Sequence, residues 1–381
     1  MKDLPSKSVP IPSRALDAVR RRMRELAYSP RVRLGAGILL GACVLAAAAS
    51  PLFRSYEKIP AASSRAASVS SESAVQTERH PLTGLPVAEP VEPPSVFGVM
   101  VENMADSWPQ SGLEEAFLVI EAPVEAAIPR FLAFYGDDQE VDKIGPVRSA
   151  RPYYLDWNAE WDALYAHVGG SDAALSLIAS GGTFDLNEYW NGRFFWRAKD
   201  RHAPHNVYTS SELLKLALGE RQERGSTPDS SYGLWTFKDD WPVDETFVVS
   251  EVTIDFWLPV YRIAWEYDPE TNAYLRSQAG KPHRMGTGNR ISTNNVAIME
   301  TDVQILDDVG RRKIRTIGTG RALVFQDGRL IRGTWSKPMP EERLRFFDAS
   351  GEEIRWNAGK TWIEVVPTLE DVDIPERNPT N

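Results

Sequence analysis

The feature that most constrains this chain is a run of twenty residues without a charged side chain, Leu34 to Phe53. As an α-helix the run would be about 30 Å long, the thickness of the hydrocarbon core of a bilayer. Six arginines precede it between positions 20 and 33, and positive charge marks the cytoplasmic flank of a membrane segment. The sequence therefore predicts a basic cytoplasmic segment at 1–33, a single N-terminal transmembrane helix at 34–53 and a body outside the cytoplasm.

A second interpretation of the same run depends on Cys43, the only cysteine of the chain. Leu40-Gly41-Ala42-Cys43 resembles a bacterial lipobox, in which the cysteine is lipidated and becomes the mature N-terminus. The apolar run continues past this cysteine through Ala49, and the basic region ahead of it is long for a signal peptide. We therefore expect an uncleaved signal-anchor, with lipidation of Cys43 as the alternative. Both place the protein on the bacterial cytoplasmic membrane.

Charge and cysteine content exclude several classes of protein. The net charge is −10, although residues 1–33 carry nine basic and three acidic side chains, so the body is strongly acidic. An acidic body argues against nucleic acid as a partner, because clustered Lys and Arg dominate that affinity. A single cysteine excludes a disulfide scaffold and any multi-cysteine zinc or iron–sulfur site.

Composition and turn signals divide the rest of the chain. Residues 54–79 are rich in Ala and Ser and predict a flexible linker. Strand and helix signals alternate over residues 80–232, which predicts an α/β domain. Residues 240–367 show almost only strand patterns, which predicts a mainly-β domain, and residues 368–381 form a polar tail.

Particular elements follow from local rules. Apolar runs predict the first strands, and Ser171 and the capping box at Thr209–Glu212 predict the starts of two helices, which Gly181 and Gly225 end. Asp327-Gly328 predicts a tight hairpin turn in the β-rich part. The expected strands are Val96–Val101, Phe117–Ile120, Arg130–Tyr135, Leu164–Val168, Val248–Trp257, Tyr261–Tyr267, Asn295–Ile305, Lys313–Ile317, Ala322–Phe325, Arg329–Trp335 and Trp362–Val366.

A set of short motifs resembles the YerB-like lipoprotein family. The motifs occur in the family's order over roughly residues 80–367 and include Pro81–Gly84, Glu102-Asn103, Pro109–Leu113, Glu121–Glu125, Gly145–Pro152, His167–Ser171, Pro204–Asn206, Tyr274–Arg276, Pro282-His283 and Gly333–Trp335. The resemblance implies a two-part domain of unknown function on a bacterial cell-surface lipoprotein. It supports an envelope location and two domains, and it supplies no reaction.

The strongest candidate site is basic. Arg130, Arg148 and Arg151 precede Gly169-Gly170-Ser171, where a helix N-terminus and two glycines expose backbone N–H groups to an anion. Guanidinium groups add bidentate donors for phosphate or carboxylate. The structural alternative is that Glu121, Glu125 and nearby aspartates pair with these arginines inside the fold.

Metal binding is the weaker hypothesis. Glu121 and Glu125 are candidates to hold Mg²⁺ or Ca²⁺ beside a bound phosphate, and ion pairs to Arg130 or Arg148 are the alternative. His202 and His205 have a metal-like spacing that His167 could join, but zinc needs further ligands that no motif supplies. We expect His202 and His205 to hydrogen-bond to backbone or to a bound phosphate.

A third candidate is aromatic. Aromatic residues cluster with Arg193 and Arg197, and such a cluster either stacks on a sugar or peptide or packs as ordinary core. The aromatic members are Tyr189, Trp190, Phe194, Phe195 and Trp196.

No nucleophile, Walker or zincin motif is present. We therefore expect a membrane-anchored extracytoplasmic cell-envelope protein that binds an anionic envelope ligand, such as a phosphate-bearing glycan or lipid, or a partner protein. The alternative is a metal-dependent phosphotransferase or hydrolase acting on a phosphorylated envelope glycan or lipid. Its motivation is that the order of strand, Arg-rich block and Gly-Gly helix start is similar to that in LytR–CpsA–Psr phosphotransferases.

Overall fold

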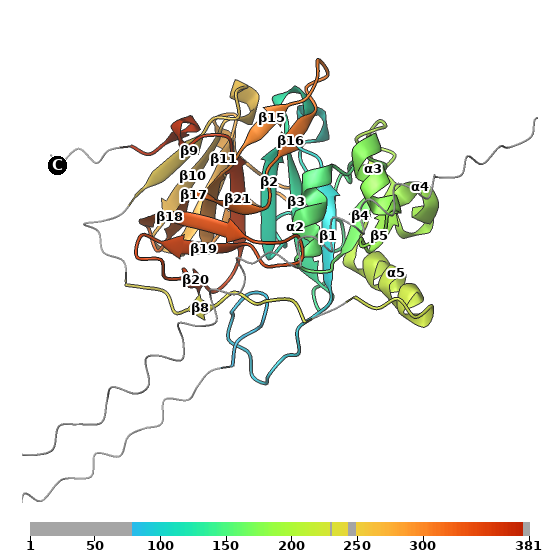
Figure 1. Ribbon diagram of the computed structural model, residues 1–381, viewed down its shortest axis with the longest axis horizontal. Coiled ribbons are helices and arrows are strands. Elements are labelled where there is room, and N and C mark those ends of the chain that lie inside the picture. The colour runs from blue at the N-terminus through green and yellow to red at the C-terminus, as the bar shows by residue number, and fades with distance from the viewer. Residues whose placement is uncertain (1–77, 229–230, 243–248, 376–381) are drawn as a thin grey trace, which may run out of the picture. The chain divides into compact units, whose positions relative to one another are not determined.

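A ten-stranded mixed β-sheet runs through the computed structural model, which describes residues 78–228, 231–242 and 249–375. Figure 1 shows its strands crossing the whole described body. In spatial order they are β19 (Arg345–Asp348), β18 (Arg329–Lys337), β17 (Gly318–Gln326), β14 (Asn295–Glu300), β21 (Thr361–Val366), β2 (Leu118–Pro123), β3 (Pro129–Gly136), β1 (Val96–Val101), β4 (Leu164–His167) and β5 (Asp185–Asn187).

The two halves of the chain meet inside this sheet. The N-terminal half is mixed α/β and the C-terminal half mainly β, as the sequence predicts. The junction is the parallel pair β2–β21, in which Glu121 lies opposite Glu364. The halves therefore share one sheet, which the sequence pattern did not predict.

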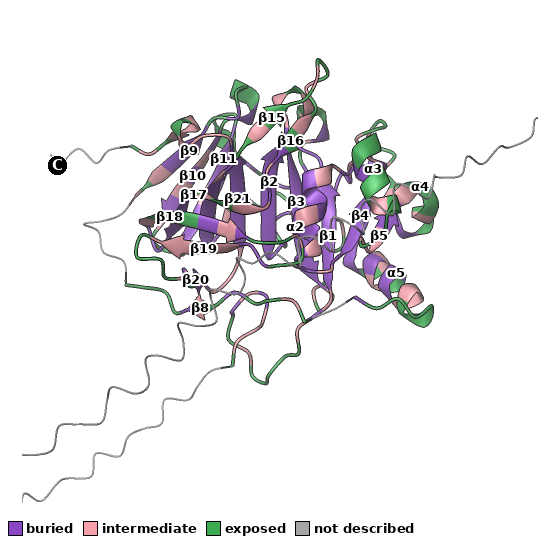
Figure 2. Cartoon of the chain, viewed as in Figure 1, coloured by how far each residue is buried: buried purple, intermediate pink, exposed green. Residues whose placement is uncertain are grey.

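A smaller sheet packs on one face of the large one. Its strands, in order, are β12 (Lys281–Pro282), β11 (Ala273–Gln278), β10 (Ile263–Asp268), β9 (Glu251–Ile254) and β22 (Val372–Asp373), and β13 (Ser292–Thr293) pairs with β11. The large sheet has a hydrophobic core on each face, and consecutive residues of β2 belong to different cores. Val119 belongs to the core that contains Trp265 of the small sheet, and Ile120 belongs to the core that contains Trp157 on the opposite face. Both faces are covered, so the central strands are buried without interruption (Figure 2).

The remaining elements are short. The helices are α2 (Pro152–Ala159), α3 (Asp172–Ala179), α4 (Glu188–Asn191) and α5 (Ser211–Glu223), and one-turn 3₁₀ helices are η2 (Ala105–Ser107), η3 (Glu125–Ala127), η4 (Gly192–Phe194), η6 (Pro259–Tyr261) and η7 (Leu369–Asp371). Three two-stranded ladders are β15 (Val303–Ile305) with β16 (Arg312–Ile314), β20 (Trp356–Asn357) with β8 (Phe237–Lys238), and β6 (Trp196–Arg197) with β7 (Val207–Tyr208).

Local sequence rules located several of these elements. The side chains of Ser171 and Ser210 cap α3 and α5, as predicted. Asp327 and Gly328 form the β17–β18 turn with φ of 54° and 68°, the left-handed backbone that this dipeptide favours. The sequence did not predict helix α2. Its own buried side chains, most of them aromatic, lie on several sides of the helix, so the sequence shows no amphipathic period.

The predicted transmembrane run 34–53 and Cys43 lie outside the described residues. Among the residues that are described, no helix is long and apolar enough to cross a membrane.

Candidate anion-binding site

The candidate site lies at one edge of the large sheet, where three segments come together. Strand β1 ends at Val101 and the chain continues into Glu102, while the antiparallel β3 begins at this edge with Pro129 and Arg130. The segment before α2 runs beside the end of β1, and the Arg148 N–H donates to the carbonyl of Met100 at 2.8 Å. Arg151 is the extended residue that precedes α2. Backbone pairing therefore brings all three arginines to one place.

The three arginines line a pocket of about 200 Å³, which we call the arginine pocket. Its other lining residues come from the ends of β1 and β2 and from the loop between β2 and β3: Glu102, Asn103, Met104, Val124, Glu125, Ala126 and Ile128. The three arginines line a pocket, as an anion-binding site requires. Two of the three are also ion-paired, as the structural alternative predicts.

Arg151 is fully engaged within the protein. Its Nε and Nη2 donate to the two carboxylate oxygens of Glu125 at 2.6 and 2.7 Å, and its Nη1 donates to the carbonyl of Ala150 at 2.7 Å. Burial alone would raise the pKa of Glu125, but hydrogen bonds and charge from Arg151 outweigh it and the net direction is downward. Glu125 is therefore an arginine partner, as the structural alternative predicts.

Arg148 pairs with a residue that sequence reasoning overlooked. Its Nε lies 2.9 Å from Oε1 of Glu102, a carboxylate that is 3% exposed. The other oxygen of Glu102 accepts from Nδ1 of His205 at 2.9 Å. In the sequence, Glu102 was noted only as part of a family motif. No local pattern indicates that it pairs with an arginine, because its partners lie 46 and 103 residues away.

Arg130 is the exception. It is 7% exposed, and its Nη1 donates to the carbonyl of Ser149 at 2.7 Å. No carboxylate of the described residues forms an ion pair with it. Burial, and then repulsion from Arg151 and Arg148, lowers its pKa to about 10, so it stays charged at neutral pH. Three guanidinium groups against two carboxylates leave the pocket with an excess positive charge.

The predicted backbone part of the site is elsewhere. Gly169, Gly170 and Ser171 run beside Ala150 but do not line the arginine pocket. The first-turn N–H of Ala174 is already taken by the Ser171 hydroxyl at 3.3 Å, because Ser171 caps its own helix. The expectation that the start of α3 joins the arginines in one site is thus wrong in its geometry.

The histidines are also separated from the arginines. His202 and His205 line a neighbouring hollow of about 540 Å³ with Asp106, Trp108, Asp200 and Arg201. His205 reaches the arginine pocket only through Glu102. His167 is bound to Asp185 at 2.6 Å and to the carbonyl of Gly169 at 2.7 Å, so the three histidines form no cluster.

The two glutamates proposed as metal ligands do not face a common site. Glu121 is completely buried and accepts from Arg276 Nη2 at 2.7 Å, while Glu125 is held by Arg151. The partner of Glu121 is thus an arginine of the C-terminal half, not Arg130 or Arg148. In the described part of the chain, no three His, Cys, Asp or Glu side chains are grouped as a metal site would require.

A buried polar network surrounds Glu121. Arg276 also donates to Gln278 at 2.6 Å and contacts Nδ1 of His283. Burial, and then the charge of Arg276, lowers the pKa of His283 well below its ordinary value. The network reaches the arginine pocket through Asn103, a lining residue that donates to Glu121 at 3.3 Å, and we assign it to the cohesion of the two halves.

The predicted aromatic cluster divides between core and surface. Phe194 and Phe195 are buried, whereas Tyr189 and Trp190 are 63% and 84% exposed. Trp196 stacks on Tyr208 at 6.0 Å between ring centroids. The core interpretation therefore holds for Phe194 and Phe195, and stacking on a sugar or peptide stays a prediction for the exposed Tyr189 and Trp190.

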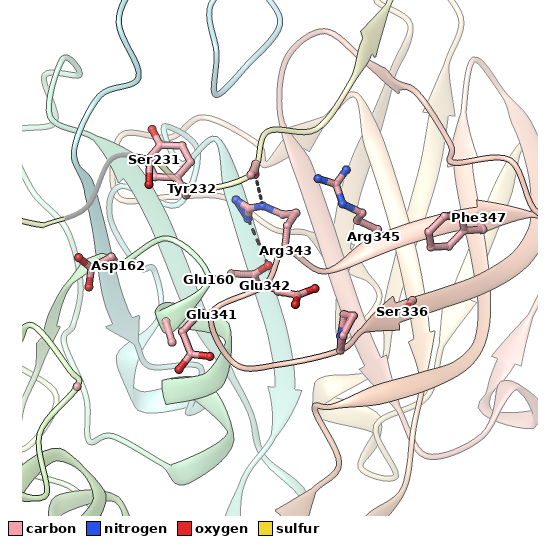
Figure 3. A pocket seen from close by; sticks show the side chains of 14 residues that line it. Glu160, Asp162, Ser231, Tyr232, Ser336, Glu341, Glu342, Arg343, Arg345 and Phe347 are labelled. Carbon is pink, nitrogen blue, oxygen red and sulfur yellow. Dashed lines mark hydrogen bonds and ion pairs between the residues drawn. The ribbon is translucent and has the colours of Figure 1, made fainter. Parts of the chain in front are cut away.

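A larger hollow of about 540 Å³ lies beside the end of α2 (Figure 3). Arg343 is buried in its wall, where it donates from Nε to the carbonyl of Gly233 at 2.9 Å and lies 3.4 Å from Glu160. Glu341 and Glu342 also line this hollow. Its two arginines, Arg343 and Arg345, are paired with Glu160 and Glu353 and its rim is acidic, so it is a poorer anion site than the arginine pocket.

Comparison with known proteins decides the family. Residues 82–224 match the N-terminal domain, and residues 252–363 the C-terminal domain, of a family described as "Protein of unknown function (DUF3048)". The chain belongs to this family. Within it, the chain is 33% identical over 298 residues to "Putative lipoprotein YerB" of Bacillus subtilis (strain 168), an alignment that covers 77% of this chain and 88% of the relative. The crystal structure of the YerB protein from Bacillus subtilis matches with a TM-score of 0.69 at 31% identity, covering 78% of this chain and 99% of that one.

The DUF3048 family thus has the two parts that the sequence motifs predicted. Its two domain matches fall on the α/β half and the β-rich half, and the strands of both build the ten-stranded sheet.

Proposed function

We propose that this DUF3048 protein is a cell-envelope protein, tethered outside the cytoplasmic membrane, whose arginine pocket binds the phosphate group of an envelope ligand. The observation that carries the proposal is Arg130, a buried arginine in a pocket without a carboxylate of its own. Burying a charge is costly unless it is paired. An anionic ligand would supply the missing partner.

The neighbouring groups fit a phosphate better than a neutral ligand. Arg148 and Arg151 are held in place by Glu102 and Glu125, so their guanidinium groups are fixed around the pocket. Preorganised donors lower the entropic cost of binding. Hydrogen bonds to charged groups contribute about 1.5–3 kcal/mol each, so one well-made contact changes affinity about tenfold or more.

The tether is proposed from the sequence and from the relative. Residues 34–53 can hold the body at the membrane either as an uncleaved helix or through a lipid on Cys43. The Bacillus subtilis relative is named a lipoprotein, which favours the lipid.

The test is calorimetric titration of the full chain in detergent with inorganic pyrophosphate. We expect saturable binding that Arg130→Met weakens at least tenfold. Arg193→Met is the matched control, because it removes the same charge from a surface residue that pairs with Glu220. Equal binding by the wild type and the Arg130 variant, or an equal loss in both variants, would show that the pocket is not the site.

A further inference from the structure

The arginine pocket is too small to hold more than the charged end of a ligand. Its volume of about 200 Å³ equals that of roughly seven molecules of liquid water. A phosphate group fits such a space, and the rest of any larger ligand must lie against the rim. The chemistry of the rim therefore indicates what kind of molecule carries the phosphate.

One side of the rim is the β15–β16 hairpin. Its tip lies against the β2–β3 loop. The approach is close enough that a Cβ added to Gly310 would lie 3.3 Å from the backbone nitrogen of Ala126. The tip exposes three large apolar side chains: Ile305, Leu306 and Val309 are 65%, 57% and 66% exposed. In Figure 1 this hairpin rises at the top of the molecule, and Figure 2 shows its tip as exposed.

A second apolar loop, between β9 and β10, adjoins the first. Arg312 of the hairpin donates to the carbonyl of Val124 in the pocket wall at 3.3 Å, and its guanidinium lies 5.3 Å from the ring of Trp257. Trp257, Leu258 and Val260 are between 36% and 40% exposed. These three residues and the three of the hairpin tip form what we call the apolar rim.

The apolar rim concentrates exposed large apolar side chains to a degree that is unusual for a protein surface in contact with water. Among the described residues, fifteen large apolar side chains are exposed, and six of them lie in these two loops. Clustered exposed apolar residues mark a site of interaction with an apolar surface. Tryptophan with aliphatic neighbours is typical of the interfacial zone of a bilayer.

Charges near the rim are compatible with a lipid headgroup. In the hairpin, Asp307 pairs with Arg311, while Asp308, Arg312 and Lys313 form no ion pair with any described residue. The hairpin therefore carries a small positive excess, next to the unpaired Arg130. The acidic remainder of the body disfavours any broad attraction to an anionic membrane, so attraction is confined to this edge.

We infer that the arginine pocket binds the uncapped anionic phosphate of a membrane lipid while the apolar rim lies in the bilayer surface. This inference rests on the proposed function and names its ligand class. The tether is long enough: the 24 residues from 54 to 77 span at most about 80 Å, whereas a body of this size is about 50 Å across.

The experiment places a photoreactive benzophenone-bearing phenylalanine at Leu306 of the full chain, reconstituted in phosphatidylcholine vesicles with or without phosphatidate. Leu216 is the matched control, a leucine of α5 that is 55% exposed against 57% at Leu306. We expect cross-linking of lipid to position 306 to rise several-fold when phosphatidate is present, and cross-linking at 216 to stay at background. Arg130→Met should abolish the rise at 306, and Arg130→Lys, which keeps the charge, should retain part of it.

The outcomes separate the two proposals. If pyrophosphate binds in an Arg130-dependent way but position 306 never cross-links more than 216, the lipid inference is wrong and the proposed function stands. If neither pyrophosphate nor phosphatidate has an Arg130-dependent effect, both are wrong. Equal cross-linking at 306 with and without phosphatidate would also overturn the inference, because it would show membrane contact without a preference for an uncapped anionic phosphate over the choline-capped phosphate of phosphatidylcholine.

Discussion

Glu121 and Glu364 lie opposite each other on the parallel strands β2 and β21, one carboxyl from each half of the chain, and both are completely buried. Arg276 donates to Glu121, whereas Glu364 accepts from Trp265 at 2.9 Å and its second oxygen has no donor. Burial, and then the charge of Glu121, raises the pKa of Glu364 well above its ordinary value of 4.5. A proton on Glu364, donated to Glu121, satisfies both carboxyls and joins the two halves.

The first prediction compares glutamine at these two positions. Glu364→Gln should be nearly neutral at pH 4.5 and should stabilise the protein at pH 7, because the amide donates to Glu121 and accepts from Trp265 as a protonated carboxyl does, without having to take up a proton on folding. Glu121→Gln should lower the free energy of unfolding by about 1–3 kcal/mol, because it replaces the charged partner of Arg276 with a neutral amide. Chemical denaturation of both variants measures the difference, and equal losses would contradict the assignment of the proton.

The same pair predicts a pH dependence. A carboxyl with a raised pKa in the folded state contributes stability that is present below its unfolded value of 4.5 and is lost as pH rises through the folded value. The melting temperature of the wild type relative to Glu364→Gln should therefore fall as pH increases above about 4.5. A difference that is constant over this range would show that Glu364 titrates normally.

Arg151 predicts a dependence of the opposite sign. The folded state lowers the pKa of Glu125, so this pair contributes stability above pH 4.5 that is lost as pH falls through the lowered value. Arg151→Ala should cost roughly 1–3 kcal/mol at pH 7, and the deficit should shrink in acid. Urea titrations at pH 7 and pH 3 measure this, and a deficit that persists in acid would show that the loss is one of packing.

Arg130 should behave differently from its neighbours when it is removed. Arg130→Met eliminates a buried charge that has no carboxylate partner, so we expect a melting temperature equal to or above that of the wild type in the absence of ligand. Arg148→Ala should lower the melting temperature, because the buried Glu102 then loses its arginine and keeps its hydrogen bond with His205. Differential scanning calorimetry distinguishes them, and a lower melting temperature for Arg130→Met would indicate a structural role.

The tether makes a prediction about the N-terminus and the side of the membrane. The intact mass of protein extracted from membranes should correspond to a lipidated chain that begins at Cys43, and a chain retaining 1–42 would indicate an uncleaved helix. In either case, a reporter that is active only after export should be active when fused after Asn381. Activity of a cytoplasm-dependent reporter at that position would contradict the proposed side of the membrane.

Local features of the molecule could be predicted from the sequence because each depends on a few neighbouring residues. A serine hydroxyl that caps its own helix, as at Ser171 and Ser210, acts over three residues. The left-handed turn at Asp327-Gly328 needs only its own dipeptide, and the apolar run of β1 has the predicted bounds. The arginines of the candidate site were found for the same reason, since they lie in one short block and on the adjoining strand.

The partners of those arginines were decided only by the tertiary structure. Arg148 pairs with Glu102 across 46 residues because its segment lies beside the end of β1. Arg276 of the small sheet pairs with Glu121 of the large sheet across 155 residues because the two sheets pack face to face. Buried strands that are apolar on both faces carry no pattern that specifies their neighbour or register, so the sequence determined which segments are strands but not which strands meet. Contacts between segments distant in the sequence, such as the Arg148 segment beside β1 and the small sheet on β2, decided which arginines are neutralised by a carboxylate and which one, Arg130, is not.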